Sequence, residues 1–97
     1  MALLRIRWTR LALMHLDEAC AFIAAEAPAA ARGLLARVEK ALEVLRRFPD
    51  IGRPGRIEGT RELVLTGTPS IIPYRVKGAR IDLLAFMHAA RRWPDLL

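Results

Sequence analysis

Two amphipathic segments separated by one short break constrain the fold of this chain more than any other feature. Residues 11–25 place Ala12, Leu16, Ala19 and Ile23 at helical spacing. Residues 29–47 form a second helical stripe made of Leu34, Leu35, Val38, Ala41, Leu42 and Leu45. Helices joined by so short a break pack antiparallel, and their apolar stripes need another layer to cover them.

Local signals indicate where both helices begin and end. Thr9 is predicted to cap the first helix, because its hydroxyl can accept a hydrogen bond from a free backbone N–H group. Pro28 fits the first turn of the second helix, and Phe48-Pro49 ends it. Glu43 stands four residues before Arg47, the order that favours an ion pair on a helix surface.

The remaining segments show the alternating pattern of strands. Leu4, Ile6 and Trp8 alternate with Leu3, Arg5 and Arg7, which predicts a strand with one buried face. Residues 61–66, 70–76 and 81–87 follow as three more strands, with turns at 67–69 and 77–80. The sequence therefore predicts one α+β domain over residues 1–97. It consists of an N-terminal strand, a two-helix antiparallel hairpin, and a three-strand antiparallel meander packed against the hairpin.

The turn before the last strand predicts a register. If Gly78-Ala79 are the two loop residues, Tyr74 lies opposite Leu83 and Arg75 lies opposite Asp82. Arg75 and Asp82 are then expected to form a cross-strand ion pair. Pro73 has no N–H to donate to the ladder, so we expect a bulge or an unpaired position there.

Charge narrows the classes of partner. The chain has a formal net charge of +6, and its basic residues are fourteen arginines and only two lysines, Lys40 and Lys77. Such a balance is typical of proteins that bind nucleic acid, an acidic protein or an anionic surface. An arginine-rich composition can also reflect a GC-rich genome, so charge alone does not decide between these interpretations.

Other classes of function find no support in the sequence. Cys20 is the only cysteine, which excludes an internal disulfide and a thiolate metal cluster, and its place among apolar helical positions predicts a core residue. The sequence shows no nucleotide loop, metal-ligand cluster or cofactor motif, so we expect neither a metal nor a cofactor. No signal peptide and no membrane-length apolar run is present, which predicts a soluble cytoplasmic protein.

Four motifs in order along the chain resemble one family. They are residues 49–53 (PDIGR), 59–63 (GTREL), 74–76 (YRV) and 88–94 (HAARRWP). Together with Trp8 and the helical hairpin, they resemble the RelE/ParE superfamily, the toxins of type II toxin–antitoxin modules, also labelled plasmid-stabilisation proteins. The resemblance implies a small sheet packed on the hairpin, and an antitoxin whose disordered segment wraps the toxin. It also implies one of two activities: RelE-like members cleave mRNA on the ribosome, and ParE-like members poison DNA gyrase.

A ribonuclease would need a base, a cationic clamp for the phosphorane and an acid for the leaving oxygen. The resemblance places Arg61 in the cleft as a phosphate clamp, with Arg91 assisting it. His88 ends the last strand and could serve as acid or base, since its unperturbed pKa is near ~6.5. Tyr74 could stack or donate a proton. Glu62 is the only motif carboxylate that could act as a base, but strand alternation turns it away from Arg61.

The chain lacks the site lysines and the proton-carrying C-terminal aromatic that the resemblance implies for RelE-like nucleases. These departures favour a protein that acts by binding. Lys40 lies on a helix and Lys77 in a turn, so neither brings a lysine to the site. Trp93 cannot shuttle a proton. We therefore predict ParE-like poisoning of DNA gyrase, with a RelE-like, metal-independent and ribosome-dependent mRNA endoribonuclease as the alternative, and an inactive paralogue or basic RNA-binding module as the second alternative. The residues expected to contact the target or the antitoxin are Arg53, Arg56, Arg61, Tyr74, His88, Arg91 and Trp93.

Structural roles remain open for several of these residues. Aromatic residues such as Tyr74 and Trp93 more often pack in the core or the hairpin than form a functional site. Arg53 could anchor the glycine-rich loop of residues 50–59 to the hairpin. His15 is expected on the exposed flank of the first helix, without a functional role.

Overall fold

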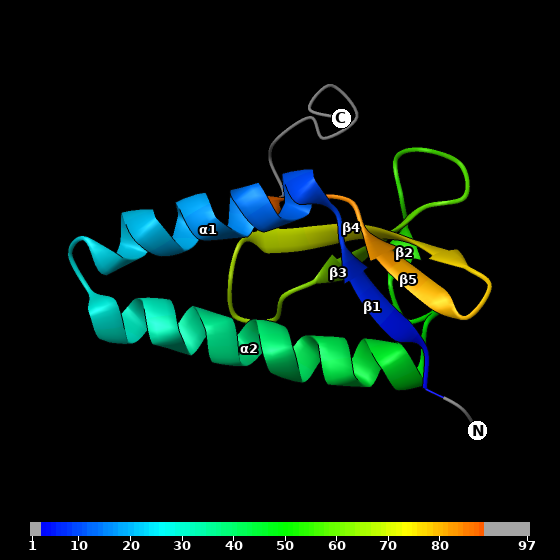
Figure 1. The fold of residues 1–97 in the computed structure, drawn as a ribbon, viewed down its shortest axis with the longest axis horizontal. Helices are drawn as coiled ribbons and strands as arrows, with labels where there is room; N and C mark the ends of the chain where they lie inside the picture. The colour runs from blue at the N-terminus through cyan, green and yellow to red at the C-terminus, as the bar shows by residue number, and fades with distance from the viewer. Residues whose placement is uncertain (1–2, 89–97) are drawn as a thin grey trace.

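The computed structural model describes residues 3–88, and its element order confirms the predicted α+β fold. The elements are β1 (Arg5–Trp8), α1 (Arg10–Ala24), α2 (Pro28–Arg47), β2 (Arg53–Pro54), β3 (Arg61–Val64), β4 (Ser70–Lys77), β5 (Arg80–Leu83) and β6 (Met87–His88). The sheet order is β1-β5-β4-β3-β2, with β6 paired to β4. β1 runs parallel to β5, and all the other pairs are antiparallel. The two helices lie side by side over one face of this sheet (Figure 1).

The helix ends follow the local signals of the sequence. The Thr9 hydroxyl accepts a hydrogen bond from the backbone N–H of Ala12 at 3.2 Å and donates one to the carbonyl of Leu83 at 2.7 Å. The cap therefore also fixes the start of α1 to the end of β5. Pro28 is the first residue of α2. The predicted pair of Glu43 with Arg47 is wrong: Glu43 lies 3.0 Å from Nη1 of Arg46, one residue earlier.

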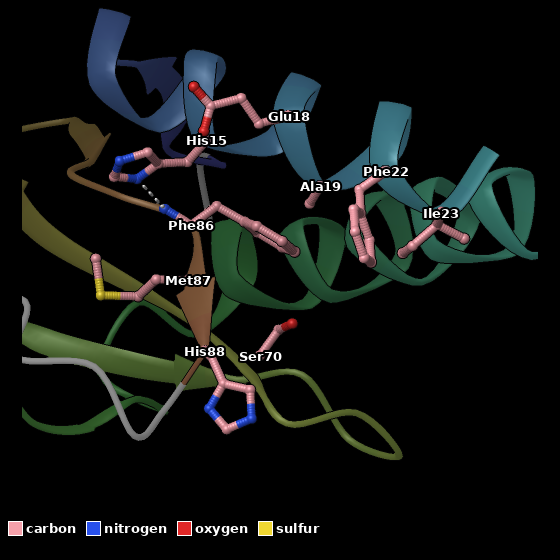
Figure 2. Close-up of a pocket in the computed structure, with 9 residues that line it drawn as sticks. All are labelled: His15, Glu18, Ala19, Phe22, Ile23, Ser70, Phe86, Met87 and His88. Carbon is pink, nitrogen blue, oxygen red and sulfur yellow. Dashed lines mark hydrogen bonds between the residues drawn. The ribbon is translucent and has the colours of Figure 1, made fainter. Parts of the chain in front are cut away.

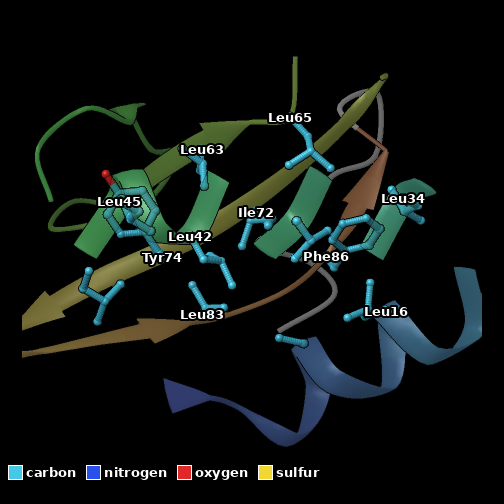
Figure 3. Close-up of a cluster of buried hydrophobic side chains, with 13 residues drawn as sticks. Leu16, Leu34, Leu42, Leu45, Leu63, Leu65, Ile72, Tyr74, Leu83 and Phe86 are labelled. Atoms are coloured by element: carbon cyan, nitrogen blue, oxygen red, sulfur yellow. The ribbon is translucent and has the colours of Figure 1, made fainter. Parts of the chain in front are cut away.

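The hydrophobic core lies between the hairpin and the sheet (Figure 3). α2 buries Ala31, Leu34, Val38, Leu42 and Leu45. β3, β4 and β5 contribute the facing residues, Leu63, Ile72, Tyr74, Ile81 and Leu83. The predicted stripe of α2 is wrong in one member, because Leu35 is 41% exposed. On the helical wheel Leu35 lies at the border of the buried stripe, so its side chain stays partly in solvent.

The predicted register between the last two long strands is confirmed, with Tyr74 opposite Leu83 and Arg75 opposite Asp82. The predicted interruption at Pro73 is also confirmed. Tyr74 lies opposite Leu83 and Ile71 lies opposite Met87. The first residues of these pairs are three positions apart and the second are four apart, so the chain facing β4 has one extra residue. This bulge divides the predicted strand of residues 81–87 into β5 and β6. The loop of residues 50–59 also contains the short strand β2, which the sequence analysis did not predict.

The predicted ion pair of Arg75 with Asp82 is wrong. Asp82 pairs with Arg7 on the parallel neighbour β1, at 2.9 Å, and with Arg80 on its own strand, at 2.8 Å. Burial by itself would raise the pKa of Asp82, but the hydrogen bond from Arg80 and the charges of Arg7 and Arg80 outweigh it and hold that pKa below its usual value. The parallel pairing of β1, which the sequence did not reveal, supplied the partner that competes with Arg75.

The lowered pKa of Asp82 predicts a pH-dependent contribution to stability. A carboxyl whose folded-state pKa is depressed stabilises the fold above its unfolded pKa, here near 3.8, and loses that contribution as pH falls through the folded-state value. Asp82→Asn is therefore expected to lower the free energy of unfolding by about 1–3 kcal/mol at pH 7. In denaturant titrations the difference from wild type should shrink below pH 3.8, whereas exposed Asp17→Asn should have little effect. A difference that stays constant down to strong acid would contradict this role.

None of the helices within residues 3–88 is both long and apolar enough to cross a membrane.

Candidate functional site

The loop between α2 and β3 is held by Tyr74. This side chain is fully buried, and its hydroxyl donates to the carbonyl of Pro49 at 2.6 Å and accepts from the N–H of Gly52 at 2.9 Å. A Cβ at Gly52 would lie only 2.5 Å from the Tyr74 hydroxyl oxygen, so the loop approaches the ring as only glycine allows. Burial raises the pKa of Tyr74 above its ordinary value, although the bond from Gly52 and the charge of Arg61 oppose the change. The position of Tyr74 matches the interpretation as a core aromatic.

Arg61 supports the same loop from the first position of β3. Its Nη1 donates to the carbonyl of Asp50 at 3.1 Å and to that of Gly52 at 2.9 Å, and its Nε lies 3.8 Å from a carboxylate oxygen of Asp50. The side chain remains 40% exposed. Arg61 therefore stabilises the loop. If it also binds a phosphate, it must do so through the edge of the guanidinium group that faces solvent.

Glu62 lies on the opposite face of β3, as strand alternation predicted, and its side chain is only 3% exposed. Oε1 contacts Nη2 of Arg53 at 2.8 Å and its Nε at 2.9 Å, and Oε2 contacts Nε of Arg56 at 3.0 Å. Both oxygens that a general base would use are thus engaged by guanidinium groups. Arg53 anchors the loop as the structural interpretation proposed, although through β3 and not through the hairpin.

The hydroxyl of Tyr74 predicts a measurable stability change. Tyr74→Phe leaves the Gly52 N–H and the Pro49 carbonyl without this partner in a buried position, which is expected to cost about 1–3 kcal/mol. Denaturant unfolding would measure the loss, and Thr68→Val, which removes a half-buried hydroxyl bonded to a turn, provides a milder comparison. A loss of stability below about 0.5 kcal/mol in Tyr74→Phe would mean that a water molecule replaces the hydroxyl.

A groove of about 460 Å³ lies between α1 and the end of the sheet. Figure 2 shows its lining, which consists of His15, Glu18, Ala19, Phe22, Ile23, Ser70, Phe86, Met87 and His88. Most of this wall is apolar, and Phe22 at its rim is 84% exposed. An aromatic so exposed beside an apolar groove indicates a surface that another molecule covers.

His15 has a place in this groove that the sequence analysis missed. Its Nδ1 accepts a hydrogen bond from the backbone N–H of Phe86 at 3.4 Å, which joins α1 to the segment leading into β6 (Figure 2). The expectation of an exposed flank was wrong, because His15 is half-buried. Its spacing from Ala19, Phe22 and Ile23 carried the signal, since residues four, seven and eight positions apart share one helix face.

The structure does not gather all the predicted site residues in one place. Arg61 lies opposite Tyr74, while His88 lies opposite Ser70, four positions away along β4 and hence about 13 Å apart along the strand. Arg61 and His88 are therefore too far apart to act on one phosphate. Arg53 and Arg56 belong to the Glu62 cluster. Arg91 and Trp93 lie outside the described residues.

Two further groups bear on reactivity. Burial, together with the nearby charge of Asp17, raises the pKa of the half-buried Cys20 thiol, which suits a packing role better than that of a nucleophile. Within residues 3–88, no group of three or more His, Cys, Asp or Glu side chains is arranged to hold a metal ion.

Comparisons with known proteins agree with this geometry. Residues 6–93 match the family described as the ParE toxin of the type II toxin–antitoxin system parDE. Y4kP of Sinorhizobium fredii, a curated protein named as a toxin, is 48% identical over 93 residues, or 96% of each chain. Among solved structures, the chromosomal ParDE toxin–antitoxin system of P. aeruginosa matches with a TM-score of 0.79 and 27% identity, covering 89% of this chain and 96% of that one. The toxin–antitoxin complex RelBE2 of Mycobacterium tuberculosis matches with a TM-score of 0.64 and 26% identity, covering 90% and 99%.

Proposed function

Because the chain belongs to the ParE toxin family, and is the toxin of a type II toxin–antitoxin system, we propose that it inhibits growth by poisoning DNA gyrase. A cognate antitoxin neutralises it. In this proposal the protein works by binding its target, and its surface residues supply contacts instead of chemistry.

The main support for this proposal is that the residues expected to act in a nuclease are buried, bonded to other groups or far apart. Within the described residues, Tyr74 is buried, both carboxylate oxygens of Glu62 are paired, and Nη1 of Arg61 bonds to two loop carbonyls. His88 is exposed but lies far from Arg61 along the sheet. A ribonuclease needs its base, clamp and acid around one phosphate, and these side chains do not converge.

The likeness to the RelBE2 complex keeps one alternative, a RelE-like ribosome-dependent mRNA endoribonuclease. In that case His88 is the acid or base, and Arg91 completes the clamp from beyond the described residues. The enzyme would be metal-independent, since attack by the 2′-hydroxyl needs only proton transfer and cationic stabilisation.

Two assays on the purified toxin, freed from its antitoxin, separate these activities. One follows gyrase supercoiling and the accumulation of cleaved DNA complexes, and the other follows mRNA cleavage on programmed ribosomes. We expect trapped cleavage complexes and intact mRNA. Ribosome-dependent cuts that disappear in His88→Ala, with normal supercoiling, would establish the nuclease. Inactivity in both assays would point to a paralogue that only titrates antitoxin.

The antitoxin is proposed to occupy the groove beside α1. Its apolar wall suits the apolar face of an amphipathic helix, and the exposed ring of Phe22 at its rim can serve as an anchor of the interface. An antitoxin segment that forms such a helix could therefore fill the groove.

Phe22 provides the test of this interface. Phe22→Asp places a charge at the rim of the groove and is expected to weaken antitoxin binding by at least about thirtyfold in calorimetry, the size of an aromatic hot spot. Val44→Asp is the matched control, since Val44 is a 45% exposed apolar residue of α2 outside the groove. Equal losses in the two variants, or an unchanged affinity for Phe22→Asp, would place the antitoxin elsewhere.

A further inference from the structure

The sheet face opposite the helices carries a dense set of cations at the end formed by β1, β5 and β4. Strand register places Arg5, Arg80 and Lys77 in one row across the three strands, and Arg7, Asp82 and Arg75 in the next. Directly paired residues project on the same face, and residues two apart along a strand do so as well. The cationic face is therefore defined by Arg5, Arg7, Arg75, Lys77 and Arg80 around the carboxylate of Asp82.

The charges of this face do not cancel. Asp82 is buried, and within residues 3–88 its ion pairs are with Arg7 and Arg80. Among the described residues, Arg5, Arg75 and Lys77 make no side-chain hydrogen bond or ion pair, and Arg5 and Lys77 are exposed. Like charges directly opposite each other destabilise a sheet, so a row of three cations costs the free chain stability. Such a departure from local rules is expected at a surface built for a ligand.

The composition of the face indicates the ligand. None of its six positions is apolar, whereas protein interfaces have an apolar core depleted in charge. Neighbouring positions within a row are about 4.8 Å apart, and the two rows are about 6.6 Å apart along the strands. This spacing suits repeated phosphates. Arginine matches phosphate oxygens with two parallel hydrogen bonds. We propose that this cationic face binds the phosphodiester backbone of nucleic acid without reading its sequence.

This surface is distinct from the groove proposed for the antitoxin, which α1 and β6 line. It also does not depend on which target the toxin acts on, because gyrase with its DNA and the mRNA-loaded ribosome both present phosphodiester backbones. The face would hold the toxin against the nucleic acid beside either target. Binding can be measured without gyrase or ribosomes, so its failure would leave the proposed activity standing.

Fluorescence anisotropy of the purified chain with a labelled DNA duplex, and in parallel with a single-stranded RNA, tests the proposal over a range of salt. The logarithm of the DNA association constant should fall linearly with the logarithm of salt concentration, with a slope of about −2.7 to −4.5 if three to five phosphates are neutralised. The DNA and RNA arms decide which source supplies the backbone. No salt-dependent binding in either arm would overturn the inference.

Charge-reversal variants locate the contacts. Arg5→Glu, Arg75→Glu and Lys77→Glu combined should weaken binding by more than about a hundredfold at fixed salt, because three phosphate contacts become repulsive. Arg32→Glu, Lys40→Glu and Arg47→Glu combined change the net charge equally on exposed positions of α2. This control should stay within about threefold of wild type, since salt screens distant charges. Equal losses would mean that net charge alone drives binding and would refute the site.

Two further measurements keep the result interpretable. The corresponding glutamine triple variant relieves the repulsion between neighbouring cations, so it should fold at least as well as wild type and still lose most of its affinity. Polyglutamate of matched charge should displace DNA poorly, because a carboxylate chain lacks the phosphate spacing. If polyglutamate competes as well as DNA does, the face is a docking surface for acidic proteins and the nucleic-acid proposal fails.

Discussion

Replacing Leu45 with alanine is expected to lower the free energy of unfolding by about 2–5 kcal/mol. Leu45 is fully buried near the end of α2 and packs in the same cluster as Tyr74 (Figure 3). Truncation removes the transfer free energy of the side chain and leaves a cavity that neither the helix nor the sheet can fill by relaxing. The loss therefore tests whether the hairpin is seated on the sheet as the structure shows.

Leu35→Ala is the matched control for this prediction. Leu35 lies on the same helix and undergoes the same chemical change, but it is 41% exposed, so its loss should be well below that of Leu45. Denaturant titration measures both values. If the two substitutions cost the same, α2 would present a different face to the sheet, and the placement of the groove beside α1 would also need revision.

The double variant Arg53→Ala and Arg56→Ala is expected to cost about 3–5 kcal/mol, because it leaves the carboxylate of Glu62 buried without these partners. The two guanidinium groups are partly exposed and could turn to solvent, whereas Glu62, in the middle of β3, cannot. The penalty thus arises from the carboxylate that stays behind. Thermal or denaturant unfolding at neutral pH would measure it.

Adding Glu62→Gln to that double variant should restore part of the lost stability, since the amide removes the uncompensated charge. A triple variant that is no more stable than the double variant would show that the arginines act through packing instead of charge. The same variants separate structure from function. If the double variant, at a temperature where it is folded, still poisons the target, Arg53 and Arg56 serve the loop and are not contact residues.

Much of the fold could be predicted from the sequence because its signals are local. Helical periodicity, the Thr9 cap and Pro28 gave the hairpin, and the Gly78-Ala79 turn fixed the register of β4 with β5. Pro73 indicated a bulge because a missing N–H interrupts any ladder. Each of these depends on a few neighbouring residues, so the sequence carries the information directly.

The roles of the site residues could not be predicted in the same way, because they depend on contacts between distant segments. Arg61 and Glu62 are adjacent in sequence, yet one bonds to the loop carbonyls and the other is buried under two arginines on the opposite face. Asp82 forms an ion pair with Arg7 and not with Arg75, because β1 lies parallel beside β5 and places Arg7 opposite Asp82. His15 lines the groove, where the backbone N–H of Phe86, in the segment between β5 and β6, donates a hydrogen bond to its Nδ1.

The sequence by itself therefore determined the α+β fold, the hairpin and the toxin family, because periodicity, capping and ordered motifs are properties of short segments. Only the tertiary structure decided which charged side chains form bonds that hold loops in place and which remain exposed on the surface. Residues far apart in the chain meet only after folding, and burial then fixes the partner of each buried carboxylate. The groove beside α1 and the cationic face of the sheet are consequences of that assembly.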